Sequence, residues 1–291
     1  MNILVTGATG YLGSRLVARL AADAGNAVTA LVRPTSHLDR VQHLRPRVEV
    51  VVASAPSNLV DLLRERGVDL ILHCATNYGR AAVPRPDIVQ ANLVLPLSLL
   101  DAAVRSGRRL AFVNTDTMLD KNISAYTLSK KQFGEWLRAY SDAIVAVNVL
   151  LEHFFGPGDD PTKFVSSVVA SLLRNEPRIA LTAGEQQRDF IHVDDVVAGF
   201  EHIVHAAAGG EPGYVEYELG RGEPVRIRDF VELAKRLARN DQTHLDFGAV
   251  PYRPNEVMRI AADTTRLRAL GWRPQISLEE GLQRMLAEER P

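Results

Sequence analysis

Three glycines at intervals of three residues follow the first apolar segment of the chain. Asn2–Val5 has the composition of a short buried strand, and Gly7, Gly10 and Gly13 lie between it and a helical pattern that begins at Tyr11. Glycine allows a tight turn and a close approach of the backbone to a pyrophosphate, while the start of a helix offers unpaired N–H groups. The placement therefore predicts a strand, a turn and a helix that bind a dinucleotide.

Apolar strands alternate with helical patterns through the first half of the chain. The further strand-like segments are Ala27–Val32, Val48–Val52, Asp69–His73, Leu110–Val113 and Ile144–Leu151. The helical patterns are Tyr11–Ala22, Leu59–Arg66, Ile88–Arg105 and Ser124–Tyr140. Continuous apolar strands separated by helices indicate parallel strands that are buried on both faces. The sequence therefore predicts an α/β fold with a Rossmann-type doubly wound parallel sheet.

The pattern changes after Gly156, where glycine- and proline-containing loops separate shorter elements. Helical patterns remain at Lys163–Leu173, Ile227–Ala238 and Leu278–Glu288. We expect residues 1–152 to form a dinucleotide-binding domain, with parts of about 186–205 rejoining it. Residues 153–291 are expected to form mainly a smaller C-terminal domain that caps the open end of the sheet and binds substrate.

Composition excludes several classes of protein. The net charge is −1, so no global field attracts the chain to nucleic acid or to a membrane surface. Cys74 is the single cysteine, which excludes an internal disulfide and a multi-cysteine metal site, and we expect no metal. No uninterrupted apolar run reaches the about 18–20 residues that span a bilayer, and the first residues lack a basic leader. We therefore expect a cytoplasmic protein with no membrane or nucleic-acid partner.

The end of the second strand bears on the choice of dinucleotide. An Asp or Glu about 20 residues beyond the glycine loop usually meets the ribose 2′-hydroxyl of NAD(H). Arg33 stands there instead, with Ser36 and Arg40 nearby. Because a guanidinium suits a 2′-phosphate, the sequence favours NADP(H) over NAD(H), although a solvated surface arginine is the simpler interpretation.

Tyr126 and Lys130 are four residues apart in a helical pattern, so their side chains share one face. A phenol titrates near about 10, and a nearby ammonium lowers that pKa, which makes the phenol a usable proton donor or acceptor. Thr115 comes at the end of the preceding strand, at the edge where ligands of doubly wound sheets bind. Lys131 lies one residue further round the helix and is expected to face solvent.

Together these segments resemble the extended short-chain dehydrogenase/reductases, which are NAD(P)-dependent epimerases, dehydratases and reductases of nucleotide-linked sugars. The resemblance covers nearly the whole chain. Its motifs are Thr6-Gly-Ala-Thr-Gly-Tyr-Leu-Gly13, His73-Cys-Ala75, Asn92, Asn114-Thr-Asp116, Tyr126-x-x-x-Lys130, Phe155-Gly-Pro157, Arg188-Asp-Phe-Ile-His-Val-Asp-Asp195, Arg253-Pro-Asn-Glu256 and Leu270-Gly-Trp-x-Pro274.

The resemblance implies a role for each matching position. Thr115 would hydrogen-bond the reacting oxygen, Tyr126 would act as acid/base, and Lys130 would bind the nicotinamide ribose and tune the tyrosine. The cofactor-binding positions would be Gly7, Thr9, Gly10, Tyr11, Leu12, Gly13, Arg33, Ala75, Asn92, Tyr126 and Lys130. The substrate-binding positions would be Asp116, Thr117, His153, Arg188 and Arg253, of which the two arginines would hold a nucleotide diphosphate.

Departures from the family pattern narrow the reaction. Thr117 stands where sugar 4,6-dehydratases carry a Glu that eliminates water, which argues against dehydration. Tyr126 follows Thr115 by only eleven residues, a shorter spacing than is usual in the family. His153 stands in a segment where family members often have an Asn, and it could touch substrate or be an ordinary core histidine.

The motifs look most like those of the CDP-paratose and CDP-abequose synthase-like group. That likeness implies NADPH-dependent reduction of the 4-keto group of a nucleotide-linked deoxyhexose. A nucleotide-sugar 4-epimerase with tightly bound NAD is the alternative, and a non-catalytic, cofactor-sensing protein is a more remote one. Similar proteins commonly form homodimers through the helix that carries the tyrosine. Phe133, Trp136 and Leu137 could supply the apolar face for such a dimer, or could simply face the core.

Overall fold

The computed structural model describes residues 1–52, 58–80 and 83–290. The chain divides into two compact units. The first unit comprises Met1–Leu150 and Gly199–Tyr217, and the second comprises Leu151–Ala198 and Glu218–Pro291. The segment that returns to the first unit therefore begins and ends later than the expected 186–205.

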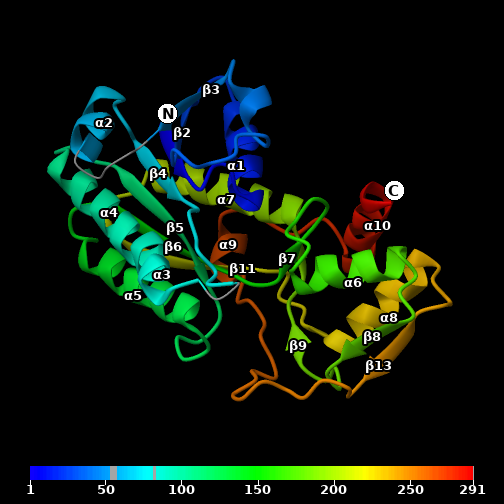
Figure 1. Ribbon diagram of the computed structural model, residues 1–291. Helices are drawn as coiled ribbons and strands as arrows, with labels where there is room; N and C mark the ends of the chain where they lie inside the picture. The colour runs from blue at the N-terminus through cyan, green and yellow to red at the C-terminus, as the bar shows by residue number, and fades with distance from the viewer. Residues whose placement is uncertain (53–57, 81–82, 291) are drawn as a thin grey trace. The chain divides into compact units, whose positions relative to one another are not determined.

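A seven-stranded sheet forms the centre of the first unit (Figure 1). Its strands, in spatial order, are β11 (Gly213–Leu219), β6 (Val145–Leu151), β5 (Ala111–Thr117), β4 (Leu70–His73), β1 (Asn2–Thr6), β2 (Ala27–Val32) and β3 (Val48–Val52). The pairs from β5 to β3 are parallel, and Thr6, His73 and Asn114 are register partners across β1, β4 and β5. The strand ends thus bring the glycine turn and the Thr115 segment to one edge.

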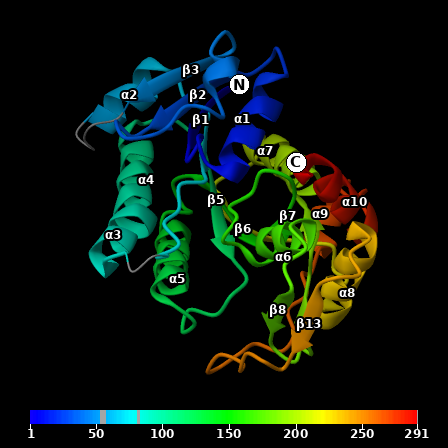
Figure 2. The same ribbon diagram turned by 45° about the vertical axis from the view of Figure 1, so that its right-hand side comes forward.

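Helices cover both faces of this sheet, as a doubly wound fold requires (Figure 2). On one side lie α2 (Leu59–Glu65), α4 (Leu95–Arg105) and α5 (Ala125–Ala139), and on the other lie α1 (Tyr11–Ala21) and α7 (Val193–Ala208). Leu4, Ile71 and Phe112 are buried strand residues that pack with Leu99 and Phe133 of the helices. The apolar strands predicted from the sequence therefore form the core because both of their faces are covered.

One strand is longer than its apolar run predicts. The sequence predicts a strand over Leu110–Val113, whereas β5 continues through the polar residues to Thr117, and all seven of its residues are buried. The polar end is tolerated because Asn114, Thr115 and Asp116 each hydrogen-bond to protein groups. Thr115 thus lies in the polar end of the strand, as the sequence predicts.

A nearly continuous helix from Arg85 to Arg105 crosses the first unit. It comprises α3 (Arg85–Val89), a π-helical turn η3 (Gln90–Val94) and α4. Among the described residues it is the one helix long and apolar enough to cross a membrane, with a mean hydropathy of 1.4 over its most apolar window. Length and composition of this kind also belong to core helices. Its inner face carries Leu99 and Leu100, which are fully buried.

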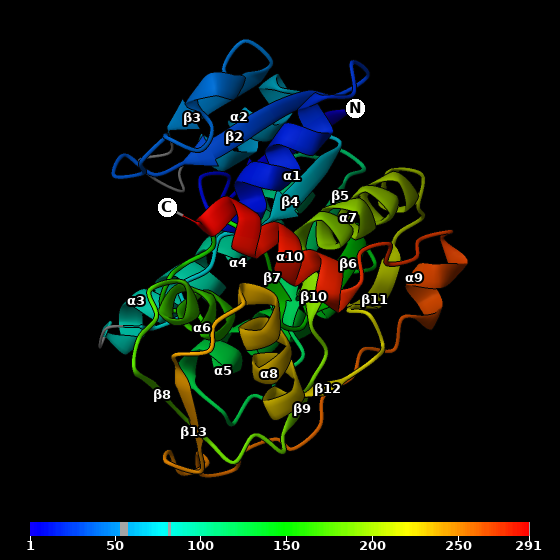
Figure 3. The ribbon, with the colours of Figure 1, turned by 90° about the vertical axis from the view of Figure 1, so that its right-hand side faces the viewer.

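The second unit has its own apolar core, and its helices are labelled in Figure 3. Its helices are α6 (Phe164–Leu173), α8 (Ile227–Ala238), α9 (Thr265–Ala269) and α10 (Leu278–Glu289). Its strands pair two by two: β7 (Phe154–Phe155) with β10 (Ile191–His192), β9 (Gln187–Arg188) with β12 (Val225–Arg226), and β8 (Arg178–Leu181) with β13 (His244–Phe247). Phe190 stacks on Phe230 at 4.0 Å between ring centroids, which joins the loop before β10 to α8.

Candidate active site

The glycine turn leaves room that side chains would fill. Gly7 has a φ of +67°, and a Cβ atom there would lie 2.5 Å from the Ala75 nitrogen. A Cβ atom on Gly13 would overlap the Gly7 carbonyl. Gly10 caps α1 without a side-chain hydrogen bond, and the first turn of α1 holds no acidic residue. The N–H groups at the start of α1 therefore remain available to an anion.

A hydrogen-bonded brace joins the ends of β1 and β4 beside this turn. The Thr6 hydroxyl lies 2.8 Å from Nδ1 of His73, and the Ala75 N–H donates to the same hydroxyl oxygen at 3.4 Å.

Asn92 is fully buried, and its amide donates to Asn77 O at 2.9 Å and to Ser129 Oγ at 3.0 Å. Asn92 thus ties the loop after β4 to α5, and its contact with cofactor stays a prediction.

Arginines gather at the end of β2. Arg33 directly follows the strand, and its N–H donates to the Ser36 hydroxyl at 3.1 Å in a short turn. The guanidinium groups of Arg15 and Arg40 lie 4.7 Å and 5.8 Å from the ring centroid of Tyr11. The first turn of α1 and the loop after β2 therefore present cations to the same region.

The three residues predicted to be catalytic lie on β5 and α5. The Thr115 hydroxyl donates to His73 O at 3.0 Å, which fixes it at the strand end. Ser124 starts α5 with a capping box, because its hydroxyl accepts from Thr127 N at 3.2 Å. The first turn of α5 then carries Tyr126, and Lys130 follows one turn later with its side chain almost fully buried.

Lys130 is a buried cation without a hydrogen-bond partner. No described group hydrogen-bonds its Nζ atom. Burial lowers the pKa of Lys130 to about 8, although the charge of Asp116 opposes the shift. A buried ammonium with no partner carries a large desolvation cost, so this atom is ready for an added hydrogen-bond acceptor.

The phenol of Tyr126 is less acidic than the sequence predicts. Burial raises the pKa of Tyr126 above its ordinary value, and the charges of Tyr78 and Asp116 raise it further, whereas a hydrogen bond from Thr117 and the charge of Arg80 lower it. Lys130 is not among the groups that lower this pKa, so the expectation that it makes Tyr126 acidic is wrong for the free protein. The cause is desolvation, which outweighs nearby positive charge.

Lys131 also departs from expectation. Its Nζ atom donates to Thr117 O and, at 3.3 Å, to Oδ2 of Asp116, and the side chain is only 28% exposed. The prediction that Lys131 faces solvent is therefore wrong. The buried Asp116 carboxylate needs a cation, and Lys131 is the side chain that reaches it. Because Asp116 is already bonded in this way, its contact with substrate stays a prediction that the structure does not support.

Two of the three substrate-binding candidates of the second unit, Arg188 and His153, contact carboxylates. Arg188 is 7% exposed, and its guanidinium contacts Oε1 of Glu256. Arg253 is exposed, and its carbonyl oxygen accepts from Glu256 N at 3.1 Å in a turn. His153 is one-third exposed, and its Nδ1 lies 2.5 Å from the buried carboxylate of Glu152. Substrate contact by all three stays a prediction.

Sequence reasoning missed Tyr78 and Arg80, in the loop after β4. The rings of Tyr78 and Tyr126 lie 5.0 Å apart, and the Arg80 guanidinium lies 5.2 Å from the centroid of Tyr78. Tyr78 is 42% exposed, although it is a large aromatic residue. Its place five residues after the end of β4 was the available signal, because that loop reaches the same edge of the sheet as Thr115.

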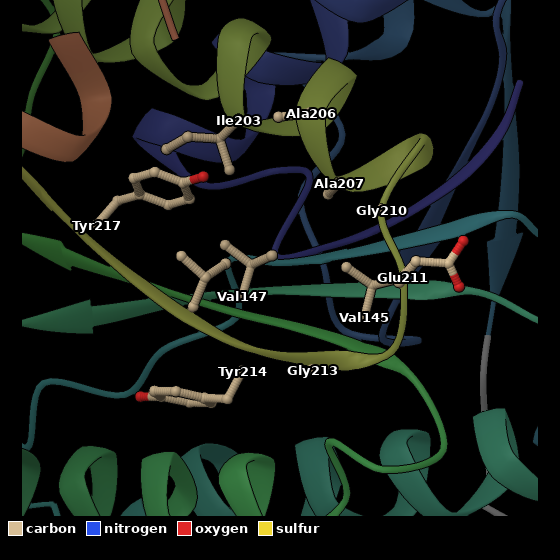
Figure 4. Close-up of a pocket in the computed structure, with 11 residues that line it drawn as sticks. Val145, Val147, Ile203, Ala206, Ala207, Gly210, Glu211, Gly213, Tyr214 and Tyr217 are labelled. Atoms are coloured by element: carbon tan, nitrogen blue, oxygen red, sulfur yellow. The ribbon is translucent and has the colours of Figure 1, made fainter. Parts of the chain in front are cut away.

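A separate cavity lies between β6, β11 and α7 (Figure 4). Its volume is about 230 Å³, and Val145, Val147, Ile203 and Tyr217 point into it while the ring of Tyr214 lies on the other side of β11. Val145 N bonds to Leu110 O, just before the start of β5, so the Val145 end of the cavity lies toward the end of the sheet opposite Thr115. It contains none of the predicted site residues.

The described residues also include no cluster of three or more His, Cys, Asp or Glu that could hold a metal.

The chain belongs to the NAD dependent epimerase/dehydratase family, whose model matches residues 3–220. It is therefore an enzyme that uses a nicotinamide cofactor, and the resemblance drawn from the motifs is confirmed. The CDP-abequose synthase of Salmonella typhimurium is 32% identical over 98% of this chain and 97% of its own length.

Solved structures share the fold over the full length. The UDP-glucose 4-epimerase of Thermotoga maritima, solved with UDP-glucose, matches 100% of this chain and 99% of its own with a TM-score of 0.84 and 21% identity. MoeE5 in complex with UDP-glucuronic acid and NAD matches 100% of this chain and 99% of its own with a TM-score of 0.83 and 23% identity. These two likenesses confirm the Rossmann-type fold.

Proposed function

We propose that this enzyme uses NADPH to reduce the 4-keto group of a nucleotide-linked deoxyhexose to an alcohol. The observation that carries the proposal is the set of Thr115 on β5 with Tyr126 and Lys130 on α5, in which burial raises the pKa of Tyr126 and so keeps its phenol a proton donor. Reduction of a ketone needs a proton donor at the oxygen, whereas oxidation of an alcohol needs a base. The 32% identity to a CDP-abequose synthase over nearly the whole chain supports the same reaction class.

The residues present fit a nicotinamide dinucleotide. The turn at Gly7 and the uncapped start of α1 would hold the pyrophosphate, and the unpartnered ammonium of Lys130 would hold ribose hydroxyls. NADPH supplies the hydride when it is bound. The positive charges at Arg33, Arg15 and Arg40 favour the 2′-phosphate of NADPH over the free hydroxyl of NADH.

Tyr126 and Thr115 have different roles at the carbonyl oxygen of the substrate. As the carbonyl carbon receives the hydride, negative charge develops on the oxygen. The Thr115 hydroxyl would turn its proton from His73 O, to which it donates in the free protein, toward that charge, and Tyr126 would transfer its phenolic proton to the oxygen, so that a neutral alcohol leaves. The nucleotide diphosphate would be gripped by Arg188 and Arg253 of the second unit, which places the binding energy away from the reacting carbon.

Exposed apolar residues on α5 and its neighbouring helix support a second copy of the chain as a further partner. Leu128 and Trp136 on α5 are 43% and 47% exposed, and Val89 and Val94 on the packed neighbouring helix are each 39% exposed. We place a second copy of the chain on this face, giving a homodimer. Of the three residues named from the sequence, Trp136 can contribute, whereas Phe133 and Leu137 are buried in the core. A cytoplasmic location would match a nucleotide-sugar substrate.

The test is an assay with a nucleotide-linked 4-keto-6-deoxyhexose and NADPH, in which the absorbance of the reduced nicotinamide is measured over time. Stoichiometric loss of NADPH with formation of the 4-hydroxy sugar is the expected result. The alternative, a nucleotide-sugar 4-epimerase with tightly bound NAD, predicts a co-purifying cofactor and interconversion of 4-epimers without net NADPH loss. That second result would overturn the reductase proposal.

A further inference from the structure

The loop after β4 places a second aromatic ring against Tyr126. The ring centroids of Tyr78 and Tyr126 lie 5.0 Å apart, and the two ring planes are inclined at 43°. Aromatic pairs with centroids about 4.5–7 Å apart attract one another in tilted and offset arrangements. Tyr78 thus packs directly on the side chain that the proposed reaction uses as its proton donor.

Burial in the core does not account for the place of Tyr78. Its side chain is 42% exposed. The apolar core of the first unit takes Tyr140 and Tyr214 against its edge, whereas Tyr78 lies outside that cluster. The Arg80 guanidinium, 5.2 Å from the ring centroid of Tyr78, lies beside the ring as well. The contact with Tyr126 is therefore a feature of the site and not of the core.

The backbone that carries Tyr78 is fixed on both sides of the ring. Asn77 N donates to Oδ1 of Asn92 at 2.7 Å, and the Asn92 amide donates to Asn77 O at 2.9 Å. Gly79 N donates to the side-chain oxygen of Asn77 at 2.9 Å. Gly79 has a φ of +66°, and a Cβ atom there would lie 2.6 Å from Cδ1 of Ile88. The loop is therefore built to hold one conformation.

Asn92 connects this loop to the helix that carries Tyr126. Its amide also donates to Oγ of Ser129 at 3.0 Å, and the Ser129 hydroxyl donates to Tyr126 O at 2.8 Å. Asn92 is fully buried, and Ser129 is 1% exposed. One buried amide in η3 therefore ties down the backbone on both sides of the ring contact, and such a satisfied buried network is rigid.

We propose that Tyr78 is a positioning residue for Tyr126, whose ring it holds in the orientation that proton transfer to the substrate oxygen requires. The kinetic consequence rests on the proposed reductase function, whereas the hold on the ring does not. More than one χ1 rotamer is open to an aromatic side chain in a helix, so the helix alone does not fix the phenol. Proton transfer needs the two oxygens within about 2.6–3.2 Å, and a misplacement of about 1 Å is costly in rate.

Two substitutions separate the ring of Tyr78 from its hydroxyl. Tyr78→Leu removes the ring and keeps an apolar side chain, and it should lower kcat about 10-fold with the KM values for NADPH and the sugar almost unchanged. Tyr78→Phe keeps the ring and should retain most of the wild-type kcat. Val104→Ala is the matched control, since Val104 is 36% exposed on α4 of the same unit and should leave kcat unchanged.

Three kinetic results would overturn the proposal. The first is near wild-type kcat in Tyr78→Leu. The second is an equal loss in Tyr78→Phe, because the hydroxyl and not the ring would then matter. The third is a raised KM for the sugar with unchanged kcat, because Tyr78 would then bind substrate and not position the phenol.

NMR of the full-length, cofactor-free protein with carbon-13-labelled tyrosine rings tests the hold on the phenol without the reaction. Tyr78→Phe and Tyr126→Phe assign the two residues, because each variant removes one set of signals. We expect a nuclear Overhauser effect between the ring protons of Tyr78 and Tyr126 in the wild-type protein. The Tyr126 signals should be sharp in the wild-type protein and in Tyr78→Phe, but broadened in Tyr78→Leu, where the ring samples more than one orientation.

Absence of the Overhauser effect, or Tyr126 signals as sharp in Tyr78→Leu as in the wild-type protein, would also overturn the proposal. If Tyr78→Leu does not fold, Tyr78→Met must broaden the signals in its place. Failure of the wild-type protein to reduce any 4-keto sugar would overturn the reductase function alone, because the NMR result does not depend on it.

Discussion

Lys130 in the first unit and Arg188 in the second are both buried cations, but their surroundings differ. Lys130 has no hydrogen-bond partner among the described groups, and burial lowers its pKa to about 8. Arg188 already contacts the carboxylate of Glu256 and donates to Gln187 O at 2.8 Å. The first site holds a cation ready for a ligand, whereas in the second site a ligand must displace an internal carboxylate.

Under the proposed function, this contrast would assign chemistry to the first unit and substrate binding to the second. Tyr126→Phe should lower kcat by about 10²–10⁴-fold, because it removes the proton donor while leaving the ring and its packing. NADPH affinity and the KM for the sugar should change little. Arg188→Met is the matched variant and should raise KM with little change in kcat. Steady-state kinetics with NADPH and the sugar measure the changes in kcat and KM. A Tyr126→Phe enzyme with near wild-type kcat would contradict the assignment of Tyr126 as the proton donor.

The unpaired state of Lys130 should be costly to the free protein. Below pH 8 the residue is charged in both the folded and unfolded chains, and its burial costs the folded state about 3 kcal/mol for a lowering of roughly 2.5 units. Between pH 8 and 10.5 the unfolded chain binds more protons, so this cost falls as pH rises. Lys130→Met should therefore raise the free energy of unfolding by about 3 kcal/mol at pH 7, and less at pH 10.

Urea unfolding at several pH values measures this effect, with the difference between the two proteins isolating Lys130 from other titrating groups. The neighbouring Lys131→Met is the natural control. It should lower stability by about 1–3 kcal/mol, because it leaves the buried Asp116 carboxylate without its cation. Destabilisation by Lys130→Met at pH 7 would mean that Lys130 makes a favourable contact in the free protein, contrary to the comparison.

The arginines near β2 extend the comparison to the cofactor. Arg33→Ala should weaken NADPH binding about 10-fold, equivalent to about 1.4 kcal/mol, because one charge-assisted contact to the 2′-phosphate is lost. NADH binding should be almost unchanged. Fluorescence titration with both cofactors tests this, and equal weakening of NADH and NADPH would exclude recognition of the 2′-phosphate by Arg33.

Glu256→Gln should have the smallest of these effects. It tests whether Glu256 competes with a ligand for Arg188. Removing the carboxylate charge lowers the cost of displacing residue 256, so a nucleoside diphosphate should bind about 3-fold more tightly, or about 0.7 kcal/mol. Calorimetry with CDP and UDP measures the change. Binding that becomes weaker instead, as in Arg188→Met, would show that Glu256 orients Arg188 for the ligand rather than competing with it.

The fold was predictable because its signals are local. An apolar strand, a glycine turn and an amphipathic helix are each encoded within about 20 neighbouring residues, and the sheet follows from their repetition. The same is true of Tyr126 and Lys130, which one helical turn brings to the same face. The apolar pattern alone stops at Val113, because a run of Asn, Thr and Asp gives no apolar signal and its partners lie on other strands.

The electrostatics of the site were not predictable in the same way. Lys131 finds Asp116 fifteen residues earlier, and Arg188 finds Glu256 68 residues later, so both pairings depend on tertiary packing. The lowered pKa expected for Tyr126 failed for a related reason. The spacing of residues along a helix indicates which charges lie near one another, but it does not indicate how strongly a side chain is shielded from water. For Tyr126, this desolvation changes the pKa more than the nearby charges do.

The state of Lys130 can be measured directly, because the chain has only five lysines. Carbon-13 NMR of the cofactor-free protein labelled at lysine Cε resolves them, and the signal missing from Lys130→Met assigns the residue. The account predicts that this signal titrates near pH 8, as expected for a buried ammonium without a partner. A midpoint at the ordinary value of about 10.5 would contradict it.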